Sequence, residues 1–144
     1  TEQQTISINK PIIFVNSAAL DDPTALRIAN EVGSRLAEAS FDKGLSTTRT
    51  FRTAGAEDVL EWTDAYNDSR NKEGTVCKRT GTNGDYYGVL RGASNVQVPG
   101  LIIEHGFHTV PEVRQAAVNE DLKNVWSKAD AEGIAAGFDL LENE

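Results

Sequence analysis

Apolar residues form short runs at some places along the chain and follow helical spacing at others. Residues 12–15 are β-favouring and apolar, and they predict a buried strand after Pro11. Helical spacing then begins behind Asp22, a typical N-cap residue, with Pro23 at the first helical position. Lys43 and Gly44 are typical of a helix end. The chain therefore begins with a strand and a long amphipathic helix.

The middle of the chain gives weaker signals. Threonines alternate with Arg49, Phe51 and Arg52, which predicts an exposed strand or an extended loop. The next residues with helical spacing predict one short helix face; they are Val59, Trp62, Thr63 and Tyr66. Residues 67–84 are polar and rich in Gly and Asn, so they predict a polar loop, and long loops are often functional or disordered. Residues 1–10 are also polar and predict a loose N-terminal segment.

The C-terminal half returns to clear patterns. Residues 86–90 predict a strand, and a second strand of residues 101–103 follows the turn at Pro99 and Gly100. Pro111 opens a short helix that runs to about residue 118, and Asn119 caps a last amphipathic helix. Strands that alternate with amphipathic helices predict an α/β fold, with a mixed or parallel open sheet flanked by helices.

Length and composition fit a single domain over residues 1–144. Of these 144 residues, 39% are hydrophobic and 25% are charged, as in ordinary globular domains. The net charge of −8 argues against a nucleic-acid partner. No apolar run approaches the ~20 residues of a membrane span. One Cys and two His exclude a disulfide framework and a Cys-rich zinc module. The missing initiator Met and signal peptide indicate a processed or trimmed chain.

Glu104 is the first candidate for a catalytic residue. It ends the apolar run 101–103, and a carboxylate at the end of a buried strand reaches the crevice where open α/β sheets bind ligands. Half-burial raises the pKa of a carboxyl group, which suits a general base near neutral pH. The alternative is a structural carboxylate that caps a helix or pairs with an arginine, in an otherwise unrelated α/β domain.

The two histidines follow Glu104 closely. Because side chains alternate along a strand, His105 is expected to face away from Glu104 and to be packed and hydrogen-bonded. His108 shares the Glu104 face while the chain stays extended, so it is a candidate for substrate binding. Neither histidine makes a metal site alone, because a catalytic zinc needs three protein ligands. The sequence also contains no H-E-x-x-H segment.

Arg91 and Cys77 are two further candidates. Arg91 follows the predicted strand 86–90 and would lie at the Glu104 end if the strands were parallel, able to bind a substrate carboxylate or pair with Glu104. The simpler interpretation is a solvated arginine at a strand end. Cys77 lies in the predicted loop beside Lys78 and Arg79, and basic neighbours lower the pKa of a thiol. No histidine is near it in sequence, which argues against a nucleophile.

Residues 85–113 carry a resemblance to a known family. Their sequence, D-Y-Y-G-V-L-R-G-A-S-N-V-Q-V-P-G-L-I-I-E-H-G-F-H-T-V-P-E-V, resembles the C-terminal part of the zinc-dependent N-acetylmuramoyl-L-alanine amidases of the amidase_3 family. There a Y-x-V-L-R strand precedes a P-x-x-L-x-E-x-G-F-x-x-N-P-E segment. The matching positions here are Tyr87 to Arg91, then Pro99, Ile102, Glu104, Gly106, Phe107, Pro111 and Glu112. The helix around residues 25–29 is also similar, whereas residues 45–84 match poorly.

The resemblance implies a bacterial cell-wall hydrolase. Glu104 would assist a zinc-bound water that attacks the amide between N-acetylmuramic acid and L-alanine of peptidoglycan. Zn²⁺ is then the implied cofactor, peptidoglycan the implied partner, and an extracellular or cell-wall site the implied location.

The metal half of the family pattern is missing from the sequence. The family's zinc ligands are a His, a Glu and a second His, in H-x-G-H and S-x-H-x-N types of segment that this chain lacks. In one alignment residues 12–16 form the strand that follows the family's last zinc-binding His. This alignment is favoured because the helix that begins behind Asp22 then follows at the right distance. In the other, residues 14–17 are the His segment with Val15 in place of the ligand. The family's Asn after G-F-x-x is also replaced, by Val110.

These departures leave a second hypothesis open. It is a non-catalytic or truncated amidase-like fragment that binds peptidoglycan or a partner without cleaving. A partial sheet exposes an edge, which favours a dimer or association with a missing N-terminal segment.

Overall fold

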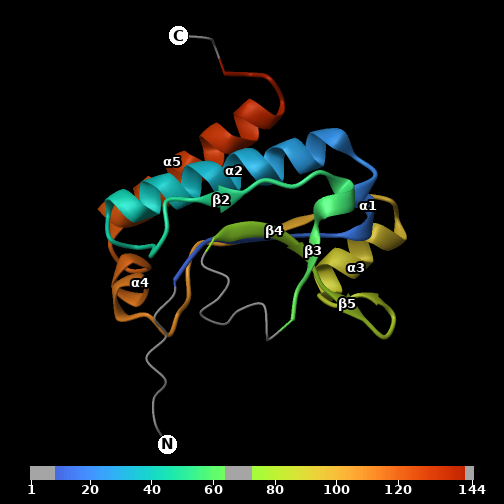
Figure 1. Ribbon diagram of the computed structural model, residues 1–144, viewed down its shortest axis with the longest axis horizontal. Helices are drawn as coiled ribbons and strands as arrows, with labels where there is room; N and C mark the ends of the chain where they lie inside the picture. Colours follow the sequence, from blue (N-terminus) through green and yellow to red (C-terminus); the bar gives the residue numbers. More distant parts are fainter. Residues whose placement is uncertain (1–8, 64–72, 142–144) are drawn as a thin grey trace, which may run out of the picture.

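A mixed five-stranded sheet lies at the centre of the computed structural model, which describes residues 9–63 and 73–141 (Figure 1). Strand β1 (Ile12–Val15) lies between β4 (Gly74–Lys78), which is parallel to it, and β7 (Leu101–Glu104), which is antiparallel. The short strands β2 (Phe51–Arg52) and β3 (Leu60–Glu61) both pair in parallel with β4. The predicted α/β fold with a mixed open sheet flanked by helices is confirmed.

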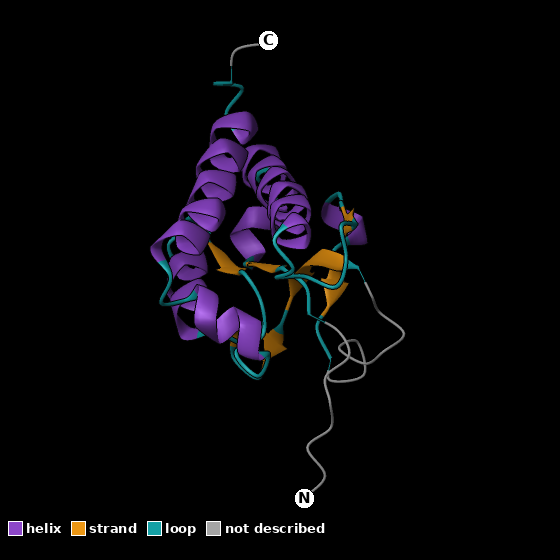
Figure 2. Cartoon of the chain, turned by 90° about the vertical axis from the view of Figure 1, so that its left-hand side faces the viewer, coloured by secondary structure: helices purple, strands orange, loops and turns teal. Residues whose placement is uncertain are grey.

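Two long helices cover one face of this sheet (Figure 2). They are α2 (Pro23–Asp42) and α5 (Glu120–Gly137), and both begin at the predicted caps. The side chains of Asp22 and Asn119 each accept a hydrogen bond from a backbone N–H of the first turn, at 3.0 and 3.1 Å. Helix α2 ends before Gly44, whose φ of 70° suits the glycine there.

The remaining elements are short. In chain order they are α1 (Ser17–Leu20), a 3-10 helix (Ala56–Asp58), the hairpin strands β5 (Thr80–Gly81) and β6 (Gly84–Asp85), α3 (Gly88–Asn95) and α4 (Pro111–Ala116). Helix α4 confirms the short helix predicted from Pro111. Helix α3 and the hairpin lie on the other side of the sheet from α2 (Figure 1).

The side chains of β1 divide the interior into two cores. Ile13 and Val15 pack with residues of α2 and α5, whereas Ile12 and Phe14 pack with Cys77 of β4 and Leu90 of α3. All four β1 side chains are at most 1% exposed. A strand buried on both faces needs apolar residues at every position, which explains the unbroken run at 12–15.

Helices α2 and α5 approach each other at two glycines. A Cβ atom at Gly133 would lie 2.5 Å from the Cα of Val32, and one at Gly137 would lie 2.8 Å from the Cα of Ile28. No side chain fits at those distances, so glycine permits the close backbone approach.

The predictions for the two polar segments are wrong where the structure describes them. Within the predicted loop 67–84, residues 74–78 form the central strand β4 and residues 80–85 form the hairpin, while 67–72 lie outside the described residues. Position 74 of β4 requires glycine, because a Cβ there would lie 2.6 Å from the carbonyl oxygen of Pro11. In the supposedly loose segment 1–10, Asn9 and Lys10 are 3% and 0% exposed; residues 1–8 lie outside the described part.

Two predicted elements have a different conformation in the structure. The helix face predicted from Val59 is instead extended at β3, and Tyr66 lies outside the described residues. The strand predicted at 86–90 is wrong because helix α3 begins at Gly88. A short apolar run does not distinguish a strand from a helix. The helix places Leu90 in the core beneath the sheet, which decides between them.

Candidate functional site

Glu104 is the last residue of β7, and its position follows from the direction of that strand. Because β7 runs antiparallel to β1, Glu104 pairs with Ile12 at the beginning of β1. The carboxylate therefore lies at the amino ends of the parallel strands, and the expectation of a crevice at their carboxyl ends is wrong. The Glu104 side chain points to the same face of the sheet as Ile12, its cross-strand partner, and this face is opposite α2 and α5.

The environment of Glu104 changes its proton affinity. Burial raises the pKa of the Glu104 carboxyl above its ordinary value of 4.5, and the positive charge of Arg79 offsets part of this rise. Within residues 9–63 and 73–141, no hydrogen bond or ion pair to the Glu104 carboxylate is found. The predicted half-burial and raised pKa of Glu104 agree with the structure, and its role as a general base stays a prediction.

Arg79 is a residue of this face that the sequence reasoning did not select. Its guanidinium carbon lies 3.7 Å from the ring centroid of Tyr86, and its Nη1 donates a hydrogen bond to the Tyr87 hydroxyl at 3.4 Å. The two tyrosine rings meet edge to face with centroids 5.3 Å apart. The adjacent tyrosines Tyr86 and Tyr87 are the signal in the sequence that could have pointed to this arginine. Tyr87 packs in the core, whereas Tyr86 is 49% exposed.

Aromatic rings lie beside these charged groups. The ring of Phe14 contacts Trp62 and Tyr87 edge to face, with centroids 5.5 and 5.1 Å apart. Phe14 itself is 1% exposed. Through Tyr87, this cluster fixes the hairpin side chains against the same sheet face that holds Glu104. On this face the Glu104 carboxylate lies at the amino ends of the parallel strands, whereas Arg79 and the Tyr87 hydroxyl lie behind the carboxyl end of β4.

Asn9 holds the turn that follows Glu104. Its Oδ1 accepts a hydrogen bond from the backbone N–H of Phe107 at 2.9 Å, and its Nδ2 donates to the carbonyl of Leu45. A Cβ at Gly106 would lie 3.1 Å from the Asn9 Oδ1, so only a glycine fits there without displacement. The buried amide thus fixes the chain direction directly behind the candidate base.

His105 has the packed role that the sequence predicts. Its Nε2 lies 2.7 Å from Oδ2 of Asp130 on α5, and its ring lies over Trp126 with centroids 5.3 Å apart. Trp126 in turn donates from Nε1 to Ser40 Oγ at 3.2 Å. His105 is therefore on the helix side of the sheet, opposite Glu104.

His108 and Arg91 are not brought together with Glu104. The chain turns after Gly106 rather than staying extended, so His108 is exposed and the condition for sharing the Glu104 face is not met. Arg91 lies in α3, not behind a strand, and its Nη1 donates to the carbonyls of Asp85 and Tyr86 at 3.0 and 3.3 Å. Asp85 binds the Ser17 N–H just after β1, so Arg91 is at the opposite end of β1 from Glu104.

Cys77 is a core side chain and not a loop thiol. It lies on β4 with no exposed surface, and burial raises the pKa of its thiol to about 12. The positive charge of Lys10 offsets only part of that rise. The expectation that basic neighbours lower this pKa is therefore wrong, because desolvation of the thiolate outweighs them.

The residues of this face do not fit a zinc ion. Within the described part of the chain, no three His, Cys, Asp or Glu side chains are grouped so that they could hold a metal ion. His105 is bonded to Asp130 on the far side of the sheet, and Cys77 is buried among apolar side chains. The described donor set therefore falls short of the three protein ligands of a catalytic zinc.

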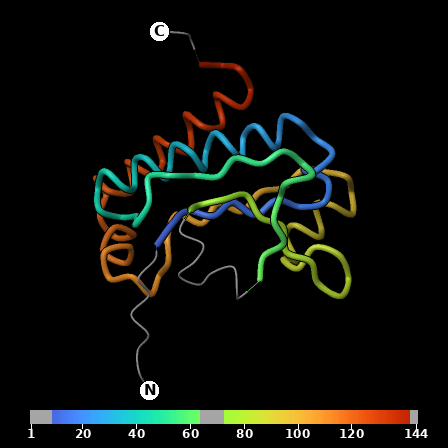
Figure 3. The backbone as a smooth tube through the Cα atoms, viewed as in Figure 1, coloured from blue at the N-terminus to red at the C-terminus, as the bar shows by residue number. Residues whose placement is uncertain are grey.

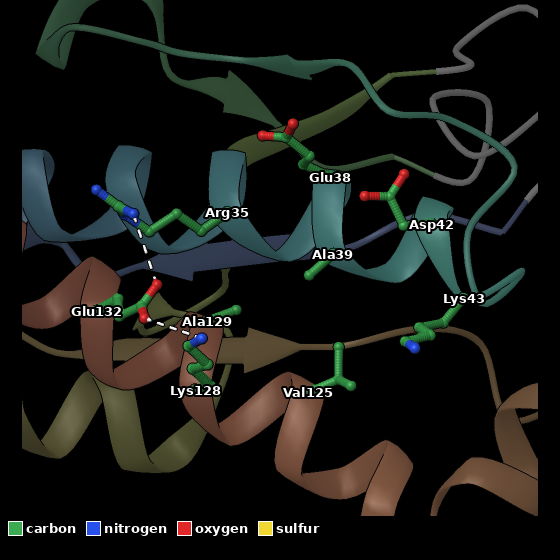
Figure 4. A pocket seen from close by; sticks show the side chains of 9 residues that line it. All are labelled: Arg35, Glu38, Ala39, Asp42, Lys43, Val125, Lys128, Ala129 and Glu132. Carbon is green, nitrogen blue, oxygen red and sulfur yellow. Dashed lines mark ion pairs between the residues drawn. The ribbon is translucent and has the colours of Figure 1, made fainter.

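A surface groove of about 400 Å³ lies between α2 and α5 (Figure 4). Three of its charged side chains are paired with one another: Glu132 contacts Arg35 and Lys128, both at 3.8 Å. The groove is on the helix side of the sheet and has no contact with Glu104. We therefore do not include it in the candidate site.

The structure is a mixed α/β domain with a half-buried carboxylate on the sheet face opposite its two long helices. Comparison with known proteins adds no relative: no family model, no curated protein and no solved structure matches the chain. Among the described residues, no helix is both long and apolar enough to cross a membrane.

Proposed function

We propose that the chain is a cell-wall hydrolase domain of the N-acetylmuramoyl-L-alanine amidase type, with Glu104 as its general base. One structural observation supports this most directly: a half-buried carboxylate with a raised pKa ends β7 and has no described hydrogen-bond partner. The similarity of residues 85–113 to the amidase_3 family supplies the substrate, the peptidoglycan amide. An extracellular or cell-wall location belongs to the same proposal.

The proposed reaction is hydrolysis of an amide. The Glu104 carboxylate accepts a proton from water as the water oxygen bonds to the amide carbon, and it then passes that proton to the leaving nitrogen. The C–N bond breaks, which leaves a carboxylate on the muramic acid and a free amine on L-alanine. The Zn²⁺ implied by the resemblance would polarise the carbonyl when bound. Because the described residues provide no ligand set for it, no step is assigned to zinc.

Substitution of Glu104 tests the proposal. We expect Glu104→Gln to lower the rate of amine release from purified cell wall by about 10²–10⁴-fold, because the amide keeps the size but accepts no proton. Glu57→Gln, in an exposed 3-10 helix, is the matched control and should retain the wild-type rate. Wild-type activity of Glu104→Gln would contradict the assigned role.

A second function is favoured by the missing ligand set. A non-catalytic amidase-like domain would bind peptidoglycan or a partner without cleaving it. It predicts that the wild-type chain sediments with purified cell wall while releasing no amine, and that Glu104→Gln sediments to the same extent. If the wild-type chain releases amine and Glu104→Gln does not, the result supports the hydrolase.

A further inference from the structure

We propose that two copies of this chain associate through the outer edge of β7, as an antiparallel pair of strands related by a two-fold axis. Such an interface uses the same surface on both copies. It does not depend on the proposed function. The register of β7 against β1, the backbone groups that this register leaves unpaired and the residues that a second β7 would meet all support it.

Strand β7 ends the sheet on one side. The main path of the sheet runs β2-β4-β1-β7, and among residues 9–63 and 73–141 no strand pairs with the outer side of β7. Its four residues are all partly exposed, whereas those of β1 are at most 1% exposed. An edge strand of this kind can accept a further strand through its backbone.

The register shows which backbone groups of β7 point outward. The backbone N–H of Asn16 donates to the carbonyl of Gly100, so hydrogen-bonded pairs with β1 recur at positions 102 and 104. The alternate residues, Leu101 and Ile103, therefore direct their N–H and C=O groups away from β1. In the part of the chain that the structure describes, no loop or side chain bonds to these four groups.

Strand β7 lacks the features that protect an edge strand from pairing. It contains no lysine and no proline, and its register with β1 runs without a bulge. The opposite side of the sheet differs, because β2 and β3 are two residues long and each includes a charged residue, Arg52 or Glu61. The side of the sheet that is open to pairing is therefore that of β7.

A second copy of β7 fits this edge. With the two-fold axis at Ile102, Leu101 of each copy faces Ile103 of the other, and these pairs exchange four N–H···O=C bonds. An axis perpendicular to the sheet keeps each face on its own side, so Ile102 meets its counterpart on the Glu104 face. The apolar residues of one strand thus face apolar residues of the other.

The charges of β7 favour the same register. Glu104 of one copy lies opposite Gly100 of the other, so the two carboxylates are at opposite ends of the strand pair. A shift by two residues would set Glu104 against Ile102, and a shift by one would pair residues from opposite faces. Because each chain has a net charge of −8, salt should strengthen the association by screening the repulsion.

Sedimentation velocity of the full chain tests the association. We expect the mass to rise from that of one chain toward that of two between about 5 and 500 µM, since the interface is small. Ile102→Lys sets two like charges face to face at the axis and should raise the dissociation constant about tenfold or more. Thr53→Lys, exposed behind β2 on the opposite side of the sheet, is the matched control and should dimerise like the wild type.

A mixing experiment distinguishes a lost interface from a lost fold. Ile102→Lys and Ile102→Glu should each be monomeric, because like charges meet at the axis. An equimolar mixture should regain dimers, because a lysine of one copy then faces a glutamate of the other. Such rescue requires both variants to be folded and position 102 to lie on the axis. If both variants are folded by circular dichroism and the mixture stays monomeric, the interface is overturned.

Cysteine substitution tests the register independently of these variants. Facing residues of a non-hydrogen-bonded pair have Cα atoms about 4.5 Å apart, which a disulfide can bridge. Under mild oxidation Ile102→Cys should therefore form a disulfide-linked dimer, whereas Glu104→Cys, which faces Gly100, should not. Cys77 is buried and should give no background. Equal cross-linking at the two positions would overturn the register, also where the charged variants fail to fold.

The outcomes are independent of the hydrolase proposal. A wild-type chain that stays monomeric up to about 500 µM overturns the interface, as does dimerisation that weakens when salt is added. Dimers that Ile102→Lys weakens and Ile102→Cys cross-links support it, even if the wild-type chain releases no amine from cell wall. Amine release by a strictly monomeric chain supports the hydrolase and overturns the interface alone.

Discussion

Glu104 and Cys77 show how burial acts on single ionisable residues in this fold. Both lie on the sheet face opposite α2 and α5, and both have a raised pKa because burial disfavours the charged form. The consequence differs between them. Glu104 becomes a better proton acceptor near neutral pH, whereas Cys77 becomes chemically inert.

Glu104→Gln should stabilise the fold at neutral pH. The pKa of Glu104 is raised on folding, so the related stability is fully present below the unfolded value of about 4.5 and is lost as the pH rises through the folded value. Glutamine is neutral at every pH, so the variant does not lose this stability as the pH rises. We expect a higher melting temperature for the variant at pH 7 and no difference at pH 3.5. A lower melting temperature of the variant at pH 7 would contradict this pKa shift.

Cys77 should resist thiol reagents in the folded chain. With a pKa of about 12, about one thiol in ten thousand is ionised at pH 8, and the side chain has no exposed surface. We expect less than about a tenth of the thiol to react with a chromogenic disulfide in the time that the chain in 6 M guanidinium takes to react fully. Rapid labelling of the native chain would contradict the placement of Cys77 in the core.

Among the helices and strands, the sequence predicts correctly the elements whose own residues contain both a boundary signal and a hydrophobic pattern. Helices α2 and α5 have caps and a full amphipathic stripe, and β1 has four consecutive apolar residues. Strand β4 has no such signal, because it is central and close-packed, with Gly74 and Thr75 where a predictor looks for large apolar residues. Helix α3 was missed because packing of Leu90, not local preference, selects the helix.

The candidate site was predictable only in part for a related reason. Glu104 stands at the end of an apolar run that is visible in the sequence. Arg79 is 25 positions earlier, and only the sheet brings its hairpin to the same face. The antiparallel direction of β7 has no signature within four residues, so the expected crevice was placed at the wrong end of the sheet.

The contact between α2 and α5 makes a prediction about glycine. Gly133→Ala should destabilise the fold by about 1–3 kcal/mol, because its Cβ would lie 2.5 Å from the backbone of Val32. Gly92→Ala in α3 is the control: a Cβ there meets nothing within 4 Å, and alanine favours helices by about 0.5–1 kcal/mol. Urea unfolding compares the two. Equal effects would contradict the close approach of the helices.

At the scale of the whole molecule, the sheet separates two sides with different chemistry. One side holds the larger apolar core, the α2–α5 pair and the His105–Asp130 contact. The other side holds the smaller aromatic cluster, Glu104, and Arg79 stacked on Tyr86. Neither side gathers three metal-ligating side chains among the residues that the structure describes.

Metal content is a property of the whole chain that follows from this arrangement. After incubation with excess zinc and dialysis, we expect elemental analysis to find well below one zinc per chain. His108→Ala is the informative companion, because His108 is the exposed histidine. Retention of one zinc by the wild-type chain and its loss in this variant would contradict the expectation and place His108 among the ligands.

The central position of β1 has a consequence for biosynthesis. Figure 3 shows β1 beside strands that come much later in the sequence, and β7 ends about 90 residues after it. At about 5–20 residues per second, roughly 4–20 s pass before both partner strands exist. In that interval the four consecutive apolar residues of β1 have two unpaired edges, and such a segment is prone to aggregation. Pro11 and Asn16 flank this segment on either side. Helix α2 follows β1 after the single turn of α1, so it is the first long element that covers a face of this strand in the nascent chain.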